Sequence, residues 1–201
     1  MMLASLLFPF KLAICVFTAL LFGHAAIHKL GDFGKFCGIL ANYRVLPQVL
    51  VMPVAGMLAS AESVLSGLLL FQYGANQSAL AAALLLLLYA AAMYVNLRRG
   101  RSYIDCGCGD RSMHQPISRR MVLRNAVIAA VLIVSIWLPA PDVAQGIAPN
   151  AAMLPALALG LVCFILYLGN EALAMVSSRP RKRLAPSLAR LAWSRFPEDQ
   201  R

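Results

Sequence analysis

The chain has 201 residues, of which 61% are hydrophobic and only 13% are charged. A soluble domain carries about 25% charged residues, so this composition excludes an ordinary soluble enzyme. The net charge of +10 comes from basic residues that flank long apolar runs. This placement argues against nucleic-acid binding and favours contact with an anionic membrane surface.

Five apolar runs approach the length of about 20 residues that crosses a bilayer. The first lacks the basic segment that opens a secretory signal, so we expect it to remain as a helix. The sequence predicts an all-α fold, a polytopic membrane bundle of about five transmembrane helices in residues 1–176. A basic tail, 177–201, follows, and its leucines fit either a short interfacial helix or a disordered segment. In chain order the runs are Leu6–Ile27, Pro47–Phe71, Ser78–Leu97, Met121–Leu138 and Ala151–Val176.

The basic residues predict the orientation of the bundle. With five spans, loops 28–46 and 98–120 share one side with the tail. That side, with the start of the fourth span, holds 17 of the 18 Lys and Arg residues. Positive residues in short loops stay in the cytoplasm. We therefore predict a bacterial inner-membrane protein with its N-terminus outside and its C-terminus in the cytoplasm.

Ionisable residues inside spans are costly to bury and mark positions with a purpose. At about 1.5 Å per residue along a helix, Lys11 and Glu62 fall at similar depths, as do Arg124 and Glu171. The sequence predicts these two ion pairs. Their simplest role is to orient helices, and a role in chemistry is the alternative.

Two further patterns lie inside the spans. Ala59, Ser63 and Gly67 recur every four positions, which suits close packing of helices in lipid. His24 and His28 lie on one face of the first span. Interfacial hydrogen bonding is the simplest interpretation of this histidine pair, and a metal site is the less favoured one.

The five cysteines fall into two groups. Cys15 and Cys163 lie inside spans, where cysteine serves as a small apolar residue. Cys37, Cys106 and Cys108 lie in two loops of the predicted cytoplasmic side, next to helix ends. Contact between Cys37 and the other two is therefore conceivable.

The unit Cys106-Gly107-Cys108 has three interpretations. Glycine lets the backbone bend enough for the sulfurs to meet, and the resulting tight disulfide is a good exchange partner. Nearby arginines favour the reactive thiolate, whereas Asp105 and Asp110 oppose it. A metal site would need Cys37 or His114 as further ligands, and zinc usually takes wider spacings. Inert loop thiols are the third interpretation, and we favour the redox dithiol.

The order of these motifs resembles the MauE family, the methylamine-utilisation membrane proteins grouped with DoxX-like redox-associated proteins. The resemblance covers roughly Phe10 to Ser135. The matching stretches are His28-Lys29, Asn42-Tyr43-Arg44-Val45-Leu46-Pro47, Glu62, Asn96-Leu97-Arg98-Arg99-Gly100, Asp105-Cys106-Gly107-Cys108-Gly109, Ile117-Ser118 and Arg124-Asn125.

The resemblance implies a thioredoxin-like partner, MauD in that pathway. It also implies a role in maturing or exporting the disulfide-rich small subunit of methylamine dehydrogenase. Cys106 and Cys108 are then the redox residues of a thiol–disulfide exchange component. No metal is expected, and a quinone near the helix ends has no support in the sequence. The accessory candidates and other motif positions are Cys37, His28, Asn42, Tyr43, Glu62, Asn96, Arg98, Arg124 and Asn125.

Two functions follow from the sequence, thiol–disulfide exchange and a non-catalytic membrane chaperone or scaffold for a redox partner. A small-solute transporter has less support, because no broken-helix repeat is present. One conflict concerns the exchange function. Disulfides of exported proteins form outside the cytoplasm, whereas the predicted orientation puts the thiols inside. Either the orientation is wrong, the pair passes electrons from a cytoplasmic donor to an outer partner, or it is reached from within the bundle.

Overall fold

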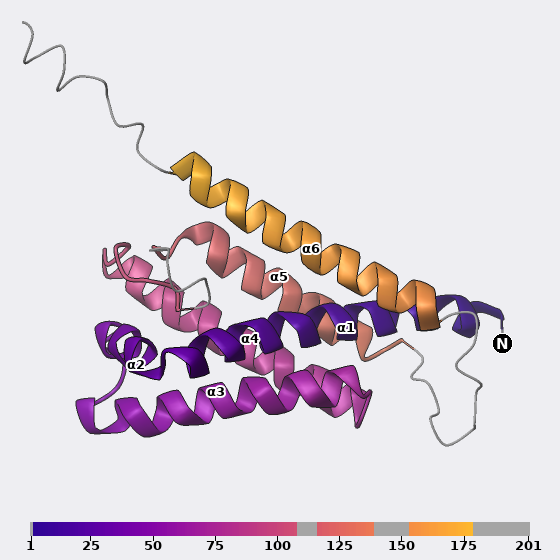
Figure 1. Ribbon diagram of the computed structural model, residues 1–201, viewed down its shortest axis with the longest axis horizontal. Helices are drawn as coiled ribbons and strands as arrows, with labels where there is room; N and C mark the ends of the chain where they lie inside the picture. The colour runs from indigo at the N-terminus through magenta and orange to yellow at the C-terminus, as the bar shows by residue number, and fades with distance from the viewer. Residues whose placement is uncertain (1, 108–115, 139–152, 179–201) are drawn as a thin grey trace, which may run out of the picture. The chain divides into compact units, whose positions relative to one another are not determined.

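The computed structural model describes residues 2–107, 116–138 and 153–178 and shows six α-helices in them (Figure 1). The chain divides into two compact units, Met1–Tyr167 and Leu168–Arg201. The predicted interfacial helix of the tail lies outside the described residues. The helices are α1 (Met2–Gly31), α2 (Phe33–Asn42), α3 (Gln48–Leu70), α4 (Ala75–Arg98), α5 (Arg119–Ser135) and α6 (Met153–Ser178).

The all-α, multi-pass architecture is confirmed. Within the described residues, four helical stretches are long and apolar enough to cross a membrane. They are Pro9–Gly31, Gln48–Leu70, Ala75–Arg98 and Met153–Ala174. The predicted fourth span corresponds to α5, which has 17 residues and is therefore about 26 Å long. A hydrocarbon core is about 30 Å thick, so α5 by itself is slightly short.

The chain leaves α-helical geometry at the end of α5. Trp137 and Leu138 donate their backbone N–H groups to carbonyls three residues earlier, at 3.1 Å. This tighter turn ends α5 before the apolar run ends. Lys11 of α1 donates a hydrogen bond of 3.0 Å to the carbonyl oxygen of Leu138, which ties the end of α5 to α1.

The α1–α3 contact uses different small residues from those predicted. Ala59 is fully buried, but Ser63 is exposed, and a Cβ added to Gly67 would meet nothing within 4 Å. Ser63 and Gly67 therefore make no close helix contact among the described residues, and packing through this stripe stays a prediction. Instead, a Cβ on Gly23 would lie 2.9 Å from the hydroxyl of Ser66.

The first part of α6 packs tightly on α1. A Cβ added to Gly160 would lie 2.9 Å from both the carbonyl oxygen of Ala13 and the Cβ of Val16. Leu12, Val16 and Ala156 form a buried cluster at this contact. Glycine here allows two helix backbones to approach closely, which is a common basis of helix association in membranes.

The central helix, α4, is rich in alanine. Ala79, Ala82 and Ala83 are fully buried, and their small side chains let α3 and α5 pack closely on either side. The core of α4 therefore combines these alanines with larger buried side chains, among them Leu85, Leu86 and Met93.

The predicted loop 28–46 contains a helix that the sequence analysis missed. In this segment α2 follows directly after α1, and the side chain of Asp32 caps it by accepting a 3.1 Å hydrogen bond from the backbone N–H of Lys35. Figure 1 shows α2 at the end of the bundle where the α4–α5 connection also lies. The two predicted cytoplasmic loops are therefore at one end.

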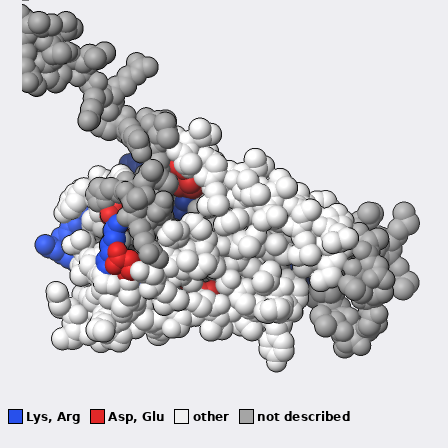
Figure 2. Space-filling model, viewed as in Figure 1, with Lys and Arg blue, Asp and Glu red and all other residues white. Residues whose placement is uncertain are grey.

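Charged residues gather at the same end. Figure 2 shows Lys and Arg over this end of the visible face, while the middle of the face is almost wholly uncharged. The uncharged middle suits lipid contact, and the basic end suits anionic headgroups. The exposed arginines of this end are Arg44, Arg98, Arg99, Arg119 and Arg120.

Candidate functional site

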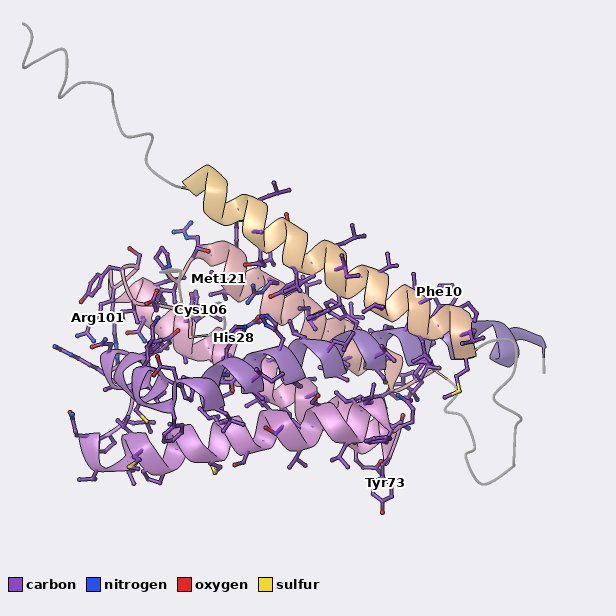
Figure 3. The ribbon with its side chains drawn as sticks, in the orientation of Figure 1. Phe10, His28, Tyr73, Arg101, Cys106 and Met121 are labelled. Carbon is purple, nitrogen blue, oxygen red and sulfur yellow. The ribbon has the colours of Figure 1, made fainter. Side chains whose placement is uncertain are left out.

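The cysteine-bearing loop begins as a short antiparallel pairing between α4 and α5. The backbone N–H of Ile117 donates to the carbonyl of Ile104 at 2.9 Å, and Asp105 pairs with Pro116. Cys106 is the first residue beyond this pairing. Its side chain is 8% exposed. It belongs to a buried cluster with Tyr43, Met93, Ile104, Ile117 and Met121. Figure 3 shows Cys106, His28 and Met121 toward the same end of the bundle.

One face of α2 forms the floor beneath this loop. Phe36, Ile39 and Tyr43 recur at helical spacing, so they share that face. A Cβ added to Gly107 would lie 3.3 Å from Ile39 and 3.6 Å from Phe36. Gly107 has a φ of 75°, which side chains other than glycine disfavour. The hydroxyl of Tyr43 donates to the carbonyl oxygen of Cys106 at 3.5 Å.

The other cysteines are placed as follows. Cys108 lies outside the described residues. Cys37 is half-buried and packs against the bundle core, so its predicted contact with the pair stays a prediction. Within the residues that the structure describes, no group of three His, Cys, Asp or Glu side chains could hold a metal ion. The metal alternative involves Cys108 and His114, both outside that part of the chain.

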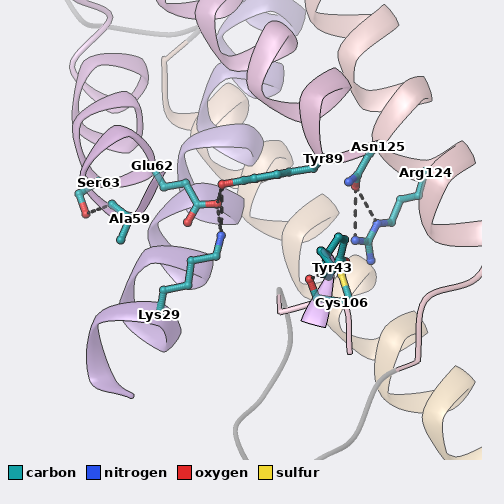
Figure 4. Close-up of polar contacts among 9 residues, drawn as sticks. All are labelled: Lys29, Tyr43, Ala59, Glu62, Ser63, Tyr89, Cys106, Arg124 and Asn125. Atoms are coloured by element: carbon teal, nitrogen blue, oxygen red, sulfur yellow. Dashed lines mark hydrogen bonds and ion pairs between the residues drawn. The ribbon is translucent and has the colours of Figure 1, made fainter. Parts of the chain in front are cut away.

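Glu62 forms its ion pair with Lys29 (Figure 4), and the predicted partner, Lys11, was wrong. Glu62 is fully buried and Lys29 is 3% exposed. The hydroxyl of Tyr89 donates to the same oxygen, Oε1 of Glu62, at 2.7 Å, and Lys29 Nζ lies 3.4 Å from that hydroxyl. Three helices therefore meet at one carboxylate.

The error has a geometric cause. The depth estimate treated the first span as ending near Ile27 and the second as beginning at the same level. In the structure, α1 continues to Gly31, and the first turns of α3 extend past it beside α2, where a Cβ on Gly56 would lie 3.9 Å from Phe33. Glu62 is consequently level with Lys29. Lys11 instead donates to Asn76 Oδ1 at 2.7 Å.

Two aromatic rings enclose the Lys29 ammonium. Its Nζ lies 5.1 Å from the ring centroid of Phe36 and 4.8 Å from that of Tyr89, distances typical of cation–π contact. The second oxygen of Glu62, Oε2, is buried without a hydrogen-bond partner among the described residues. The Lys29 ammonium is therefore neutralised by the Glu62 carboxylate and also contacts the rings of Phe36 and Tyr89.

The remaining accessory candidates lie apart from this centre. Asn96 is fully buried, and its amide nitrogen donates to the carbonyl of Ala92 at 3.1 Å. Asn125 is also buried, and its Oδ1 accepts from Arg124 at 3.3 and 3.4 Å (Figure 4). Arg98 is exposed at the basic end. These contacts are consistent with structural roles.

Two further predictions concern pairs near α1 and α5. His24 and His28 contact each other, with their Nε2 atoms 3.1 Å apart. The two histidines therefore hydrogen-bond to each other. Arg124 and Glu171 lie in different compact units, so their ion pair stays a prediction.

Sequence reasoning missed Lys29, Phe36 and Tyr89 as parts of one centre. Lys29 had been assigned to a loop, because the first span was ended at Ile27. Tyr89 offered a signal, since it is the one polar aromatic residue in the run from Leu80 to Ala92. Buried Tyr needs a hydrogen-bond partner, and Glu62 was available.

These features define a multi-pass helical membrane protein with an intramembrane ion pair and a cysteine-bearing loop at its basic end. The family described as "Methylamine utilisation protein MauE" matches residues 7–138, and the chain belongs to this family. The match includes the ion pair and both cysteines of the Cys106-Gly107-Cys108 unit.

Individual relatives agree with the family assignment. The chain is 43% identical to the methylamine utilization protein MauE of Paracoccus denitrificans over 64% of this chain and 69% of that protein. It is 37% identical to the protein of the same name from Paracoccus versutus, over 81% of this chain and 86% of that protein. The corresponding protein of Methylophilus methylotrophus is 36% identical over 78% and 81%. No solved structure matches the chain.

Proposed function

We propose that this chain is an inner-membrane thiol–disulfide exchange component of methylamine utilisation. In this proposal it acts with a thioredoxin-like partner to mature an exported client, the small subunit of methylamine dehydrogenase. Family membership supports the pathway. The observation that supports the chemistry is the packing of Cys106 and Gly107 against one face of α2.

The exchange reaction needs no cofactor. A thiolate of the Cys106–Cys108 pair attacks the partner's disulfide and forms a mixed disulfide, releasing one partner thiol. The second cysteine of the pair then attacks this mixed disulfide and releases the other partner thiol. The pair ends as a disulfide and the partner as two thiols, so two electrons and two protons have moved to the partner. The reverse sequence oxidises the partner.

The positive φ of Gly107 supports this use of the two thiols. Glycine adopts this left-handed conformation without strain, so the residue between the two cysteines allows a sharp bend of the chain. Arg98 and Arg101 lie at the same end, and positive charge near a cysteine favours its thiolate, whereas Asp105 opposes it.

We further propose five spans, with α5 and its terminal turn as the fourth, and with the basic end in the cytoplasm. The positions of the exposed arginines at one end support this orientation. In this topology the pair reacts with a cytoplasmic or membrane-embedded electron carrier. Electrons pass between the pair and an outer partner through the bundle or through a further carrier.

A scaffold that holds the redox partner without exchanging thiols is the second candidate. The observation that favours it is the low exposure of Cys106, which is 8% and lies in an apolar cluster. Buried cysteines in apolar surroundings are generally inert.

One experiment separates the two functions. Cells carrying the double variant Cys106→Ser and Cys108→Ser are tested for active, disulfide-bonded client enzyme. Cys163→Ser is the matched control, because Cys163 is an exposed cysteine on α6. The exchange function predicts loss of mature client only in the double variant. Normal maturation in both variants would refute it and leave the scaffold.

A further inference from the structure

The ion pair and the cysteine loop both lie next to one aromatic ring, that of Phe36. The ammonium of Lys29 lies 5.1 Å from the centroid of Phe36. The position of a Cβ on Gly107 is 3.6 Å from Cε2 of the same ring and 3.7 Å from Cδ2. Phe36 is 8% exposed. The same buried ring is therefore a neighbour of both the Lys29 ammonium and Gly107.

We propose that the Lys29–Glu62 pair is a positioning element for the loop at Cys106 and Gly107 and acts through Phe36. This inference rests on the proposed exchange function. Lys29 and Glu62 do not touch the reacting sulfur atoms in this account. They hold the ring of Phe36 in the position against which Gly107 packs.

The chain of contacts explains why a charged pair occupies this position. Glu62 and Tyr89 hold the ammonium from α3 and α4. The ammonium in turn attracts the face of Phe36, which belongs to α2. A short helix such as α2 is weakly stable alone, so its placement depends on such contacts. An apolar residue in place of Lys29 would fill the same space but would make no cation–π contact to orient the ring of Phe36.

The backbone of the loop has a second attachment to the same face of α2. The Tyr43 hydroxyl donates to the carbonyl oxygen of Cys106, and Ile39 lies against Gly107. A shift of Phe36 therefore moves the surface on which both residues rest. The position of Cys106, and so the reactivity of its thiol, follows the position of α2.

The test compares variants of the full-length protein in lipid nanodiscs. Lys29→Met with Glu62→Gln removes both charges together, which avoids an unpaired buried charge. Phe36→Leu removes the ring while keeping both charges. Lys29→Arg retains a cation for the ring and the carboxylate. Lys11→Met is the matched control, because Lys11 is equally buried but bonds to Asn76 and Leu138 instead.

Two readouts are measured for each variant. The first is the alkylation rate of Cys106 in a Cys108→Ser background, resolved by peptide mass spectrometry. The second is the thiol–disulfide equilibrium of the pair in glutathione buffers. The proposal expects both to change by about threefold or more in the paired variant and in Phe36→Leu, the change that loss of one cation–π contact produces. Lys29→Arg and Lys11→Met are expected to stay near the unmodified protein.

The outcomes are distinct. Unchanged alkylation of Cys106 in both the paired variant and Phe36→Leu, with folding intact, would overturn the positioning role. An equal change in Lys11→Met would also overturn it, because the effect would then be one of general stability. If the pair forms no disulfide in any protein, the exchange function fails, and the alkylation rates still decide whether Lys29 and Phe36 position the loop.

Discussion

At the scale of single residues, the carboxylate of Glu62 is fully buried and joins three helices. It accepts from both Lys29 and Tyr89 through one oxygen. Buried ion pairs contribute little net stability, because desolvation offsets their attraction. Their retention is better explained by the specific arrangement that they impose on α1, α3 and α4.

Removal of the Tyr89 hydroxyl should weaken this centre. Tyr89→Phe loses a 2.7 Å hydrogen bond to a charged acceptor, so we expect a loss of about 1.5–3 kcal/mol in the free energy of unfolding. Unfolding in mixed micelles measures it. Tyr94→Phe, on the exposed face of the same helix, should have little effect. Equal stabilities of the two variants would contradict the assigned hydrogen bond.

Gly107 offers a residue-scale test of the loop geometry. Gly107→Ala combines a φ of 75° with a Cβ 3.3 Å from Ile39. Gly100→Ala has a similar φ of 73° but no neighbour within 4 Å, so it controls for backbone strain alone. We expect Gly107→Ala to change the alkylation rate of Cys106 and Gly100→Ala to leave it unaltered. The same rate in both would mean that the loop does not rest on α2.

At the scale of helices, the long apolar runs were predictable and the short element was not. The predicted run Ser78–Leu97 corresponds closely to α4, because a run of twenty mostly apolar residues has few alternatives to a helix in a membrane. In contrast, α2 has only ten residues between two spans, so it is too short to be found as a membrane-spanning run. Missing α2 displaced the depth of Glu62 and led to the wrong partner, Lys11.

The contact between α1 and α6 can be tested at one glycine. Gly160→Ala places a methyl group 2.9 Å from backbone and side-chain atoms of α1, so the helices must separate. We expect a loss of about 1–3 kcal/mol, typical of overpacking. Gly67→Ala is the control, because its Cβ meets nothing within 4 Å. A thermal unfolding midpoint that falls in both variants alike would argue against this contact.

At the scale of the whole molecule, composition and charge carried the prediction furthest. Both indicated a multi-pass membrane protein with one basic end, and the structure places α2 and the α4–α5 connection at that end. The candidate site was only partly accessible from sequence. Cys106 and Glu62 stood out as residue types in unusual places, but their connection through Lys29 and Phe36 depends on helix packing.

The five-span topology can be tested by labelling. A membrane-impermeant maleimide should fail to reach Cys106 and Cys108 in intact spheroplasts and should reach them after permeabilisation. A cysteine introduced at Gln145, between α5 and α6, should show the reverse pattern. Labelling of the native pair in intact spheroplasts would place the basic end outside and would remove the conflict with an exported client.

The redox state of the pair tests the central claim most directly. Cells are quenched in acid, their thiols are alkylated with a reagent of known mass, and the peptide containing Cys106 and Cys108 is weighed before and after reduction. The exchange function predicts a population without label at either cysteine that gains two labels after reduction. Full labelling of both cysteines before reduction, under conditions in which the client matures, would contradict it.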